Sequence, residues 1–285
     1  MRVVLVIGFS VLCLFLVSLS FYAETPERTT SAPDGVEIAF TTDGIGEPAI
    51  VFVHGWSCDR TYWDGQMAFL RDRFQVVAVD LAGHGESGLN REEWTVEAFG
   101  ADVAAVVEKL GLEKVVLVGH SMGGAVDIEA ARLIPGRVIG LIGVDTYHDM
   151  ENAAPEAQRD AFLAAFEADF KSSVEGFVRM MFPAGADSTL VDKIAADMSS
   201  APKEPAIGAM RSVLSYNPSR KLEGLDIPVY AINADLWPTN VEAGQRQAAS
   251  FEVKLMPGLG HFVMLEDPDQ FNALLSETIG EITAR

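Results

Sequence analysis

The chain has 285 residues, of which 49% are hydrophobic, so it is long enough to bury one large core together with a smaller accessory domain. Its 41 acidic and 21 basic residues give a formal net charge of −20. Because that charge repels nucleic acid and anionic lipid, we expect neither as a partner.

Residues 1–23 resemble an export signal rather than a part of the fold. Arg2 precedes an uncharged run from Val3 to Leu19, and small residues follow near a cleavage point. The length of this run lies between that of a signal core and that of a membrane span. We therefore expect an exported protein, periplasmic or secreted, and an uncleaved N-terminal anchor that holds it at the membrane is the alternative.

Cys58 is the one cysteine that remains once this segment is removed. A single cysteine cannot form an intrachain disulfide. We expect it to be a small, partly buried thiol, because no residue near it in the sequence suggests an activating base.

The first half of the chain alternates predicted strands with predicted helices. Ala49–Val53 is continuously apolar, as in strands that are buried on both faces. Thr95 is a predicted N-cap, helical apolar spacing continues to Leu110, and Gly111 ends the helix. This rhythm implies right-handed crossovers onto a mostly parallel sheet. The predicted strands are 36–41, 49–53, 75–79, 115–118 and 138–144.

The rhythm stops between residues 147 and 222, where no strand pattern appears. Phe162, Phe166 and Phe170 recur at every fourth position, as on one face of a helix. We expect a helical lid here, inserted between two strands of the sheet. Further helices are predicted at 191–198 and 207–214, strands at 227–232 and 252–255, and a closing helix from 267, which leaves 24–146 and 223–285 as the core.

A Gly-x-Ser-x-Gly sequence, Gly119–Gly123, lies where a buried apolar strand runs into a predicted helix. Its central Ser121 would be exposed on a sharp turn, where a hydroxyl becomes a nucleophile if a base lies close to it. The strand before the motif and the helix after it make this a strong signal for a nucleophilic serine.

Three more motifs follow predicted strands, and together the four motifs are similar to those of the α/β-hydrolase family. The additional motifs are His54-Gly-Trp56, Asp80-Leu-Ala-Gly-His-Gly-Glu-Ser87 and Gly258-Leu-Gly-His-Phe262. The resemblance extends from about Gly35 to the C-terminus. It implies an α/β fold with a mostly parallel central sheet flanked by helices and a small all-helical lid inserted before the last strands.

The resemblance implies a catalytic triad of Ser121, Asp235 and His261. His261 lies on a Gly-rich loop after the last predicted strand and would take the serine proton. Asp235 follows the strand after the lid and gives the chain order Ser, Asp, His. Asp145, at the end of the strand before the lid, is the rival, since some family members place their acid there. Chain order favours Asp235.

Two backbone N–H groups are expected to form the oxyanion hole. Met122 follows the nucleophile and would supply one of them, and Trp56 would supply the other from the loop after the 49–53 strand. The indole of Trp56 would also form a wall of the pocket. Asp80 is expected to accept hydrogen bonds that close its own loop rather than to act in catalysis.

The predicted function is hydrolysis of a small or medium carboxylic ester through an acyl-enzyme. We find no metal-ligand spacing and no dinucleotide motif, so we expect no metal and no cofactor beyond water. A lactonase, a carbon–carbon bond hydrolase or a perhydrolase would use the same triad, and a ligand-sensing protein on the same scaffold is a further alternative. The apolar lid residues that would either line the site or pack the lid are Phe162, Phe166, Phe170, Met180, Met181 and Phe182.

Overall fold

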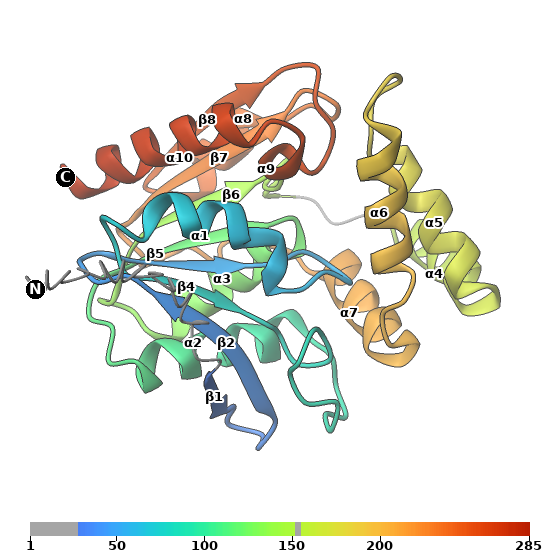
Figure 1. The fold of residues 1–285 in the computed structure, drawn as a ribbon, viewed down its shortest axis with the longest axis horizontal. Helices are drawn as coiled ribbons and strands as arrows, with labels where there is room; N and C mark the ends of the chain where they lie inside the picture. The colour runs from blue at the N-terminus through green and yellow to red at the C-terminus, as the bar shows by residue number, and fades with distance from the viewer. Residues whose placement is uncertain (1–27, 152–154) are drawn as a thin grey trace, which may run out of the picture.

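A computed structural model describes residues 28–151 and 155–285 of the chain. The predicted export signal, residues 1–23, lies outside the described residues. Eight strands form a single sheet, and helices cover both of its faces (Figure 1). The strands are β1 Arg28–Ser31, β2 Glu37–Asp43, β3 Ala49–Val53, β4 Val76–Val79, β5 Val115–His120, β6 Val138–Val144, β7 Pro228–Ala234 and β8 Ser250–Met256.

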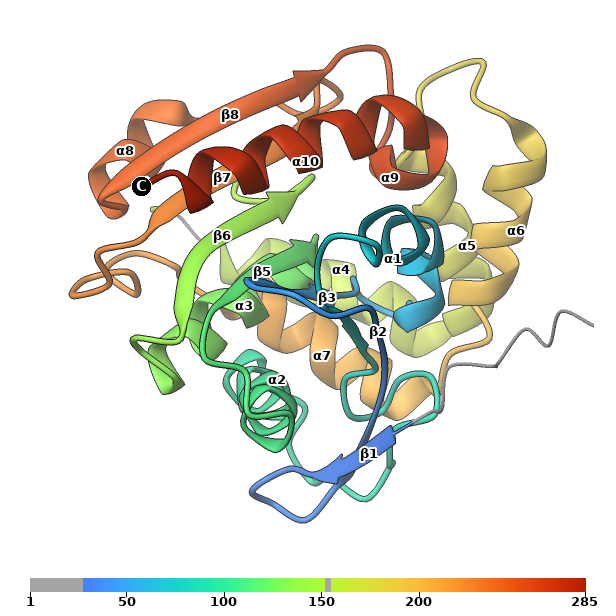
Figure 2. The same cartoon turned by 60° about the vertical axis from the view of Figure 1, so that its left-hand side comes forward.

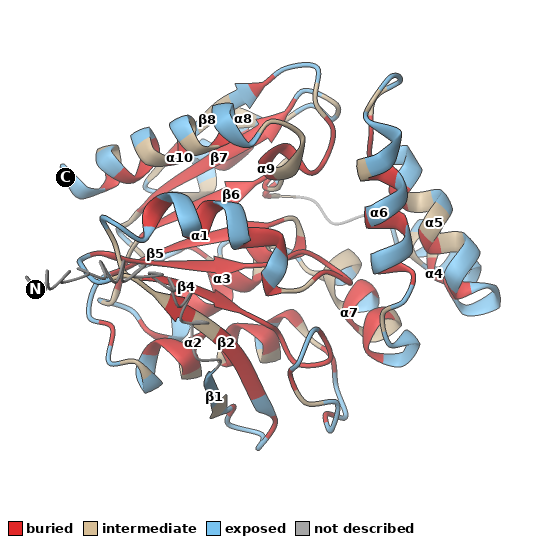
Figure 3. Ribbon diagram, in the orientation of Figure 1, coloured by how far each residue is buried: buried red, intermediate tan, exposed pale blue. Residues whose placement is uncertain are grey.

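The sheet is mostly parallel, which confirms the predicted fold class. The strand order is β1-β2-β4-β3-β5-β6-β7-β8, and only the pairs β1–β2 and β2–β4 are antiparallel. Every residue of β3, β4 and β5 is buried, as Figure 3 shows along the centre of the molecule. From β3 the chain passes to β4 on one side and then crosses to β5 on the other side of β3, so the strand order reverses between β3 and β5. In open α/β sheets, ligands bind beyond the carboxyl ends of the strands at such a point.

The helices begin and end largely where local signals predict. Thr95 caps α2 by accepting a hydrogen bond from Ala98 N at 3.1 Å, and Asp267 caps α10 by accepting one from Gln270 N at 3.0 Å. Helices α2 and α3 cover one face of the sheet, and α1 and α10 cover the other (Figure 2). The helices of the core are α1 Asp64–Leu70, α2 Val96–Lys109, α3 Met122–Leu133, α8 Val241–Gln247, α9 Val263–Glu266 and α10 Pro268–Thr283, with a 3₁₀ turn η1 at Arg60–Trp63.

Among the described residues, four helices lie between β6 and β7 in the chain and stand beside the sheet, beyond the ends of its parallel strands (Figure 1). They are α4 Glu156–Ala168, α5 Phe170–Met180, α6 Ser188–Met198 and α7 Lys203–Ser215, and we call them the four-helix segment. The described residues of this region contain no strand, as predicted. Within residues 28–151 and 155–285, no helix combines the length and the apolar character that crossing a membrane requires.

Candidate active site

Ser121 occupies a sharp turn between β5 and α3. Its backbone adopts φ 53° and ψ −114°, a conformation that an L residue rarely takes. A Cβ added at Gly119 or at Gly123 would collide with the surrounding backbone, so both positions require glycine. Ser121 N donates to Val144 O at 3.0 Å, which joins the turn to β6. The structure therefore confirms the strand–turn–helix context that was predicted for this serine.

His261 lies in the loop between β8 and α9, and its backbone is held on two sides. His120, next to the nucleophile, donates from Nε2 to His261 O at 2.9 Å. His261 N donates to Met181 O at 2.8 Å, just beyond the end of α5. His261 is 7% exposed and lines the same cavities as Ser121. The fold thus brings these two predicted residues together.

Asp145, and not Asp235, contacts His261, so the predicted partner of this histidine is wrong. Asp145 Oδ2 accepts a hydrogen bond from His261 Nδ1 at 2.6 Å, and Asp145 Oδ1 accepts one from Ala234 N at 2.9 Å. Asp235 is exposed, and its carboxylate accepts from Gly258 N at 2.8 Å. The reason is that β7 continues to Ala234, after which Asp235 turns toward the start of the β8–α9 loop rather than toward its histidine.

The carboxylate of Asp145 is stabilised in its ionised form. Burial alone would raise its pKa, but the interactions with His148 and with His261 outweigh burial and hold the pKa well below its usual range. His148 Nε2 lies 3.7 Å from Asp145 Oδ1. An ionised carboxylate on Nδ1 fixes the tautomer of the imidazole, so that Nε2 of His261 is left to accept a proton.

The loop that carries Asp145 is strained and is held by polar contacts from β7. Asp145 has φ 44° and Tyr147 has φ 59°, both in the left-handed region. Asn233 accepts from Thr146 N at 3.1 Å and donates to Thr146 O at 2.9 Å, and it also donates to Thr239 Oγ1 at 2.9 Å. Sequence reasoning missed Asn233. Its amide within the otherwise apolar β7 was the available signal, because a buried amide needs partners.

Three other histidines are buried, and burial is the main cause of their lowered pKa values. The pKa falls to about 4 for His54 and to about 3 for His84 and His120. His54 Nε2 accepts from Leu81 N at 3.0 Å, so its Nδ1 carries the proton and donates to Gly55 O at 2.8 Å. These neutral rings hold the loops around the site through their hydrogen bonds to the backbone.

The two residues predicted for the oxyanion hole both line the cavity beside Ser121. Met122 is the first residue of α3, and N–H groups at that position have no partner inside their own helix. Trp56 is buried against the four-helix segment, where its indole Nε1 donates to Ala206 O of α7 at 2.6 Å. Its ring meets the edge of Phe166 at a centroid distance of 5.5 Å. The indole is therefore a wall of the pocket and a contact between the two parts of the molecule.

Asp80 closes its own loop, as predicted. Its carboxylate accepts hydrogen bonds from Arg60 N at 2.7 Å and from Glu86 N at 2.9 Å, and it forms an ion pair with the Arg60 guanidinium. The side chain is fully buried and lines neither cavity at Ser121. Its contacts are those of a structural residue.

The apolar residues of the four-helix segment divide between lining the site and packing. Met181 lines the cavity at Ser121, and Phe182 stacks on Phe262 at 5.6 Å. Phe162 packs against Phe166 at 4.8 Å, whereas Met180 is 67% exposed. Phe170 meets the ring of Trp56 at 6.3 Å, so it supports a wall of the site without being part of the lining.

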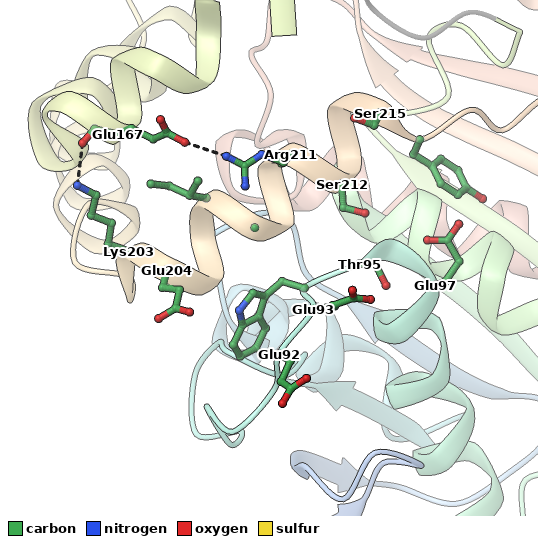
Figure 4. Close-up of a pocket in the computed structure, with 14 residues that line it drawn as sticks. Glu92, Glu93, Thr95, Glu97, Glu167, Lys203, Glu204, Arg211, Ser212 and Ser215 are labelled. Atoms are coloured by element: carbon green, nitrogen blue, oxygen red, sulfur yellow. Dashed lines mark hydrogen bonds and ion pairs between the residues drawn. The ribbon is translucent and has the colours of Figure 1, made fainter. Parts of the chain in front are cut away.

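A separate groove of about 910 Å³ lies between the loop that precedes α2 and helix α7 (Figure 4). Five glutamates line it, together with Lys203 and Arg211. Glu167 joins these cations, since its carboxylate accepts from Arg211 at 2.8 Å and its carbonyl accepts from Lys203 at 2.8 Å. Neither Ser121 nor His261 lines the groove, so it is not part of the candidate active site.

The arrangement is suited to acyl transfer. The hydroxyl of Ser121, the imidazole of His261 and the carboxylate of Asp145 lie at the carboxyl ends of the parallel strands, with Asp145 on Nδ1 of His261 and with Ser121 and His261 in the same cavities. Among the residues that the structure describes, no group of three or more His, Cys, Asp or Glu side chains is placed to hold a metal ion.

Comparisons with known proteins agree with this geometry. A profile of the alpha/beta hydrolase family matches residues 50–274. An esterase from Thermogutta terrifontis is 29% identical in sequence, and its structure superposes with a TM-score of 0.77 over 91% of this chain and 99% of that one. The bifunctional esterase/perhydrolase DCH from Acinetobacter calcoaceticus is 45% identical over 93 residues, which are 32% of this chain and 34% of the relative.

A longer match links the chain to the dihydrolipoyllysine-residue acetyltransferase component of the acetoin cleaving system from Cupriavidus necator. The two are 27% identical over 276 residues, which cover 87% of this chain and 67% of that protein. For several other curated relatives, the match spans only about a third of the relative's own length.

Proposed function

Because the chain belongs to the alpha/beta hydrolase family, we propose that it is a serine hydrolase that cleaves small or medium carboxylic esters through an acyl-enzyme. The observation that carries this proposal is the 2.6 Å contact between Asp145 and His261, in a cavity that Ser121 also lines. The esterase from Thermogutta terrifontis, which shares the fold over 91% of the chain, supports the choice of ester substrates.

The first half of the reaction acylates Ser121. Its Oγ attacks the ester carbonyl carbon while His261 Nε2 takes the hydroxyl proton, and Asp145 stabilises the imidazolium that forms. The N–H groups of Trp56 and Met122 donate to the oxyanion of the tetrahedral intermediate. The carbon–oxygen bond to the alcohol then breaks, and His261 returns its proton to the departing oxygen.

The second half of the reaction releases the acid. Water attacks the acyl carbon while His261 takes one of its protons, and the bond to Ser121 Oγ breaks as His261 gives that proton to the serine. The products are one carboxylic acid and one alcohol, and the enzyme returns to its starting state. No redox step and no cofactor enters this balance.

Hydrolysis of nitrophenyl esters by the wild type and by Ser121→Ala tests the proposal, together with labelling by a fluorophosphonate probe that reacts with activated serines. We expect wild-type turnover and labelling, and loss of both in the variant. Labelling without turnover of any ester would contradict ester hydrolysis and would favour a lactone, a carbon–carbon bond or a sensing role. Absence of labelling in the folded wild type would contradict the nucleophile itself.

We also propose that the protein is exported by means of residues 1–23. The support for this is the charged start of the segment and its uninterrupted apolar run in the sequence. Mass spectrometry of the N-terminus, on protein recovered from each cell fraction, tests the proposal. A shortened chain outside the cytoplasm is expected, an intact chain in the membrane fraction would indicate the anchor, and recovery from the cytoplasm alone would contradict export.

A further inference from the structure

Two cavities of different chemistry meet at the nucleophile. One has a volume of about 220 Å³ and the other of about 330 Å³. The residues that line both are Ser121, Met122, Val213, Leu214 and His261. The reacting groups therefore stand at the junction of the two cavities, beside the last turn of α7, and an ester bound at Ser121 would place one of its halves in each cavity.

The smaller cavity, which we call the apolar cavity, is suited to a flexible hydrocarbon chain. Apart from Ser121 and two histidines, all of its lining residues are hydrophobic. The polar atoms of two of them are already engaged, since Trp56 donates to Ala206 O and Cys58 Sγ donates to Trp56 O at 3.4 Å. Met181, Met198 and Met210 form much of the remaining wall, and unbranched thioether side chains adapt to the shape of what they contact.

The size of the apolar cavity limits the chain that it can hold. A water molecule takes about 30 Å³ of liquid volume, so 220 Å³ corresponds to roughly seven non-hydrogen atoms. Cys58, Met198 and Met210 are at most 6% exposed and so close the cavity on the inside. A chain longer than this would have to displace buried side chains.

The larger cavity, which we call the polar cavity, has a different wall. Asp145, Thr146, Tyr147, His148 and Asp149 all line it, and the apolar cavity contains none of them. The polar cavity is also the one that Asp145 and His261 share.

The oxyanion donors place the other half of the substrate. Trp56 lines the apolar cavity but not the polar one, and its N–H must lie at the carbonyl oxygen of the substrate. Met122, the other donor, lines both cavities, so the carbonyl oxygen lies toward the apolar cavity, and the acyl chain is assigned to that cavity. Its alcohol partner meets a wall that mixes apolar side chains with the polar ones of residues 145–149.

We infer that the substrates are esters of unbranched aliphatic acids of about four to seven carbon atoms with an alcohol more polar than the acyl chain. This inference rests on the proposed function and specifies its substrate class. Each methylene that enters the apolar cavity is expected to raise kcat/KM about fourfold, until the cavity is full.

A series of nitrophenyl esters from acetate to dodecanoate measures the acyl preference. We expect kcat/KM to be highest at about four to seven acyl carbons and to fall beyond that length. Met210→Ala, which enlarges the apolar cavity, is expected to move the optimum about two carbons longer, and Cys58→Leu, which fills it, about two carbons shorter. Met180→Ala is the matched control, because Met180 is exposed and lines neither cavity.

A pair of reversed esters tests the assignment of the two cavities. We expect 2-hydroxyethyl hexanoate to be cleaved with at least tenfold higher kcat/KM than hexyl hydroxyacetate, in which the apolar and polar halves are exchanged. The opposite preference would overturn the assignment. A flat profile to dodecanoate, or an unmoved optimum in folded Cys58→Leu, would overturn the cavity limit.

These outcomes are separate from failure of the proposed function, which would appear as no hydrolysis of any ester or as full activity in Ser121→Ala. Fluorophosphonate labelling and a thermal melt report whether each variant is folded. If Met210→Ala does not fold, then Cys58→Leu and the reversed esters still decide the question.

Discussion

Asn233 and Thr146 form a closed pair of hydrogen bonds across the ends of β7 and β6, in which the Asn233 side chain both accepts from and donates to the Thr146 backbone. Thr146 directly follows Asp145, whose backbone is in the left-handed region. The amide therefore fixes the loop that presents the carboxylate to His261. Asn233 belongs to β7, the strand that Asp235 follows, and it supports Asp145 at the end of the neighbouring strand β6.

Asn233→Ala is expected to lower kcat by about 10- to 100-fold, because a small misplacement of a catalytic group costs this much. KM should change little, since Asn233 lines neither cavity. Steady-state kinetics on a nitrophenyl ester measure both constants, with Asn217→Ala, at an exposed asparagine, as the matched control. A KM effect with an unchanged kcat would show that Asn233 has a different role.

Asp145→Asn is expected to lower kcat by about 10⁴-fold, the loss seen when an amide replaces the carboxylate of a serine triad. The amide can neither stabilise the imidazolium nor hold the required tautomer of His261. Asp235→Asn is the matched comparison and should retain nearly full kcat, because its carboxylate contacts Gly258 N instead. The reverse result in these two kinetic measurements would restore Asp235 as the acid.

The elements that sequence predicted well are those with strong local signals. The continuous apolar runs of β3 and β5, the Thr95 cap and the Gly-x-Ser-x-Gly turn all lie where they were expected. Sequence patterns missed β1 and the seven-residue helices α1 and α8, which offer too few residues for a periodicity to appear.

The choice between Asp145 and Asp235 depends on information that is not local. Both residues come just after buried parallel strands, and those strands are hydrogen-bonded neighbours. Which carboxylate reaches the histidine depends on where each strand ends and on a positive φ at Asp145. Neither property can be read from hydrophobic patterning, whereas Ser121 and His261 could be placed because their motifs determine the local backbone.

Stability should fall with acidity below about pH 6.5, because the buried histidines resist protonation. In the unfolded chain a histidine titrates near 6.5, whereas the pKa of His84 in the fold is lowered to about 3. Between these values the unfolded state binds more protons than the folded state. The contribution of the neutral histidine to stability is therefore fully present above pH 6.5 and is lost as the pH falls.

His84→Asn removes one of these groups while keeping a donor for Ala82 O, to which His84 Nδ1 donates at 3.0 Å. Relative to the wild type, the loss of unfolding free energy between pH 7 and pH 5 should be about 2 kcal/mol smaller. Urea unfolding at the two pH values measures this difference. Equal losses in the two proteins would show that His84 is not a source of the acid sensitivity.

Asp127 should destabilise the fold at neutral pH. Its carboxyl group is fully buried in α3 without a hydrogen-bond partner among the described residues, and burial raises its pKa well above the usual range. The folded state therefore holds a proton that the unfolded state releases above about pH 4. The contribution of this bound proton to the free energy of unfolding is fully present below that pH and is lost as the pH rises toward the folded pKa.

Asp127→Asn cannot ionise, so it should unfold with a higher free energy than the wild type at pH 7 and with nearly the same free energy at pH 3.5. The gain at pH 7 is about 1.4 kcal/mol for each unit by which the folded pKa exceeds the unfolded pKa, counted up to pH 7. Chemical denaturation at both pH values gives the comparison. A variant less stable than the wild type at pH 7 would mean that the carboxylate has a partner.

The contacts of residues 147–150, just after β6, determine where the four-helix segment can be exchanged for that of a related enzyme. Tyr147 donates to Gly124 O at 2.9 Å, and the Nδ1 of His148 lies 3.1 Å from Thr239 Oγ1. Both residues therefore belong to the loop that carries Asp145, although the predicted lid begins at residue 147. Met150 is fully buried. A chimera that takes its four-helix segment from another enzyme should therefore be joined after Met150. Joined there, it would take a new substrate range from the other enzyme and keep its own contact between Asp145 and His261.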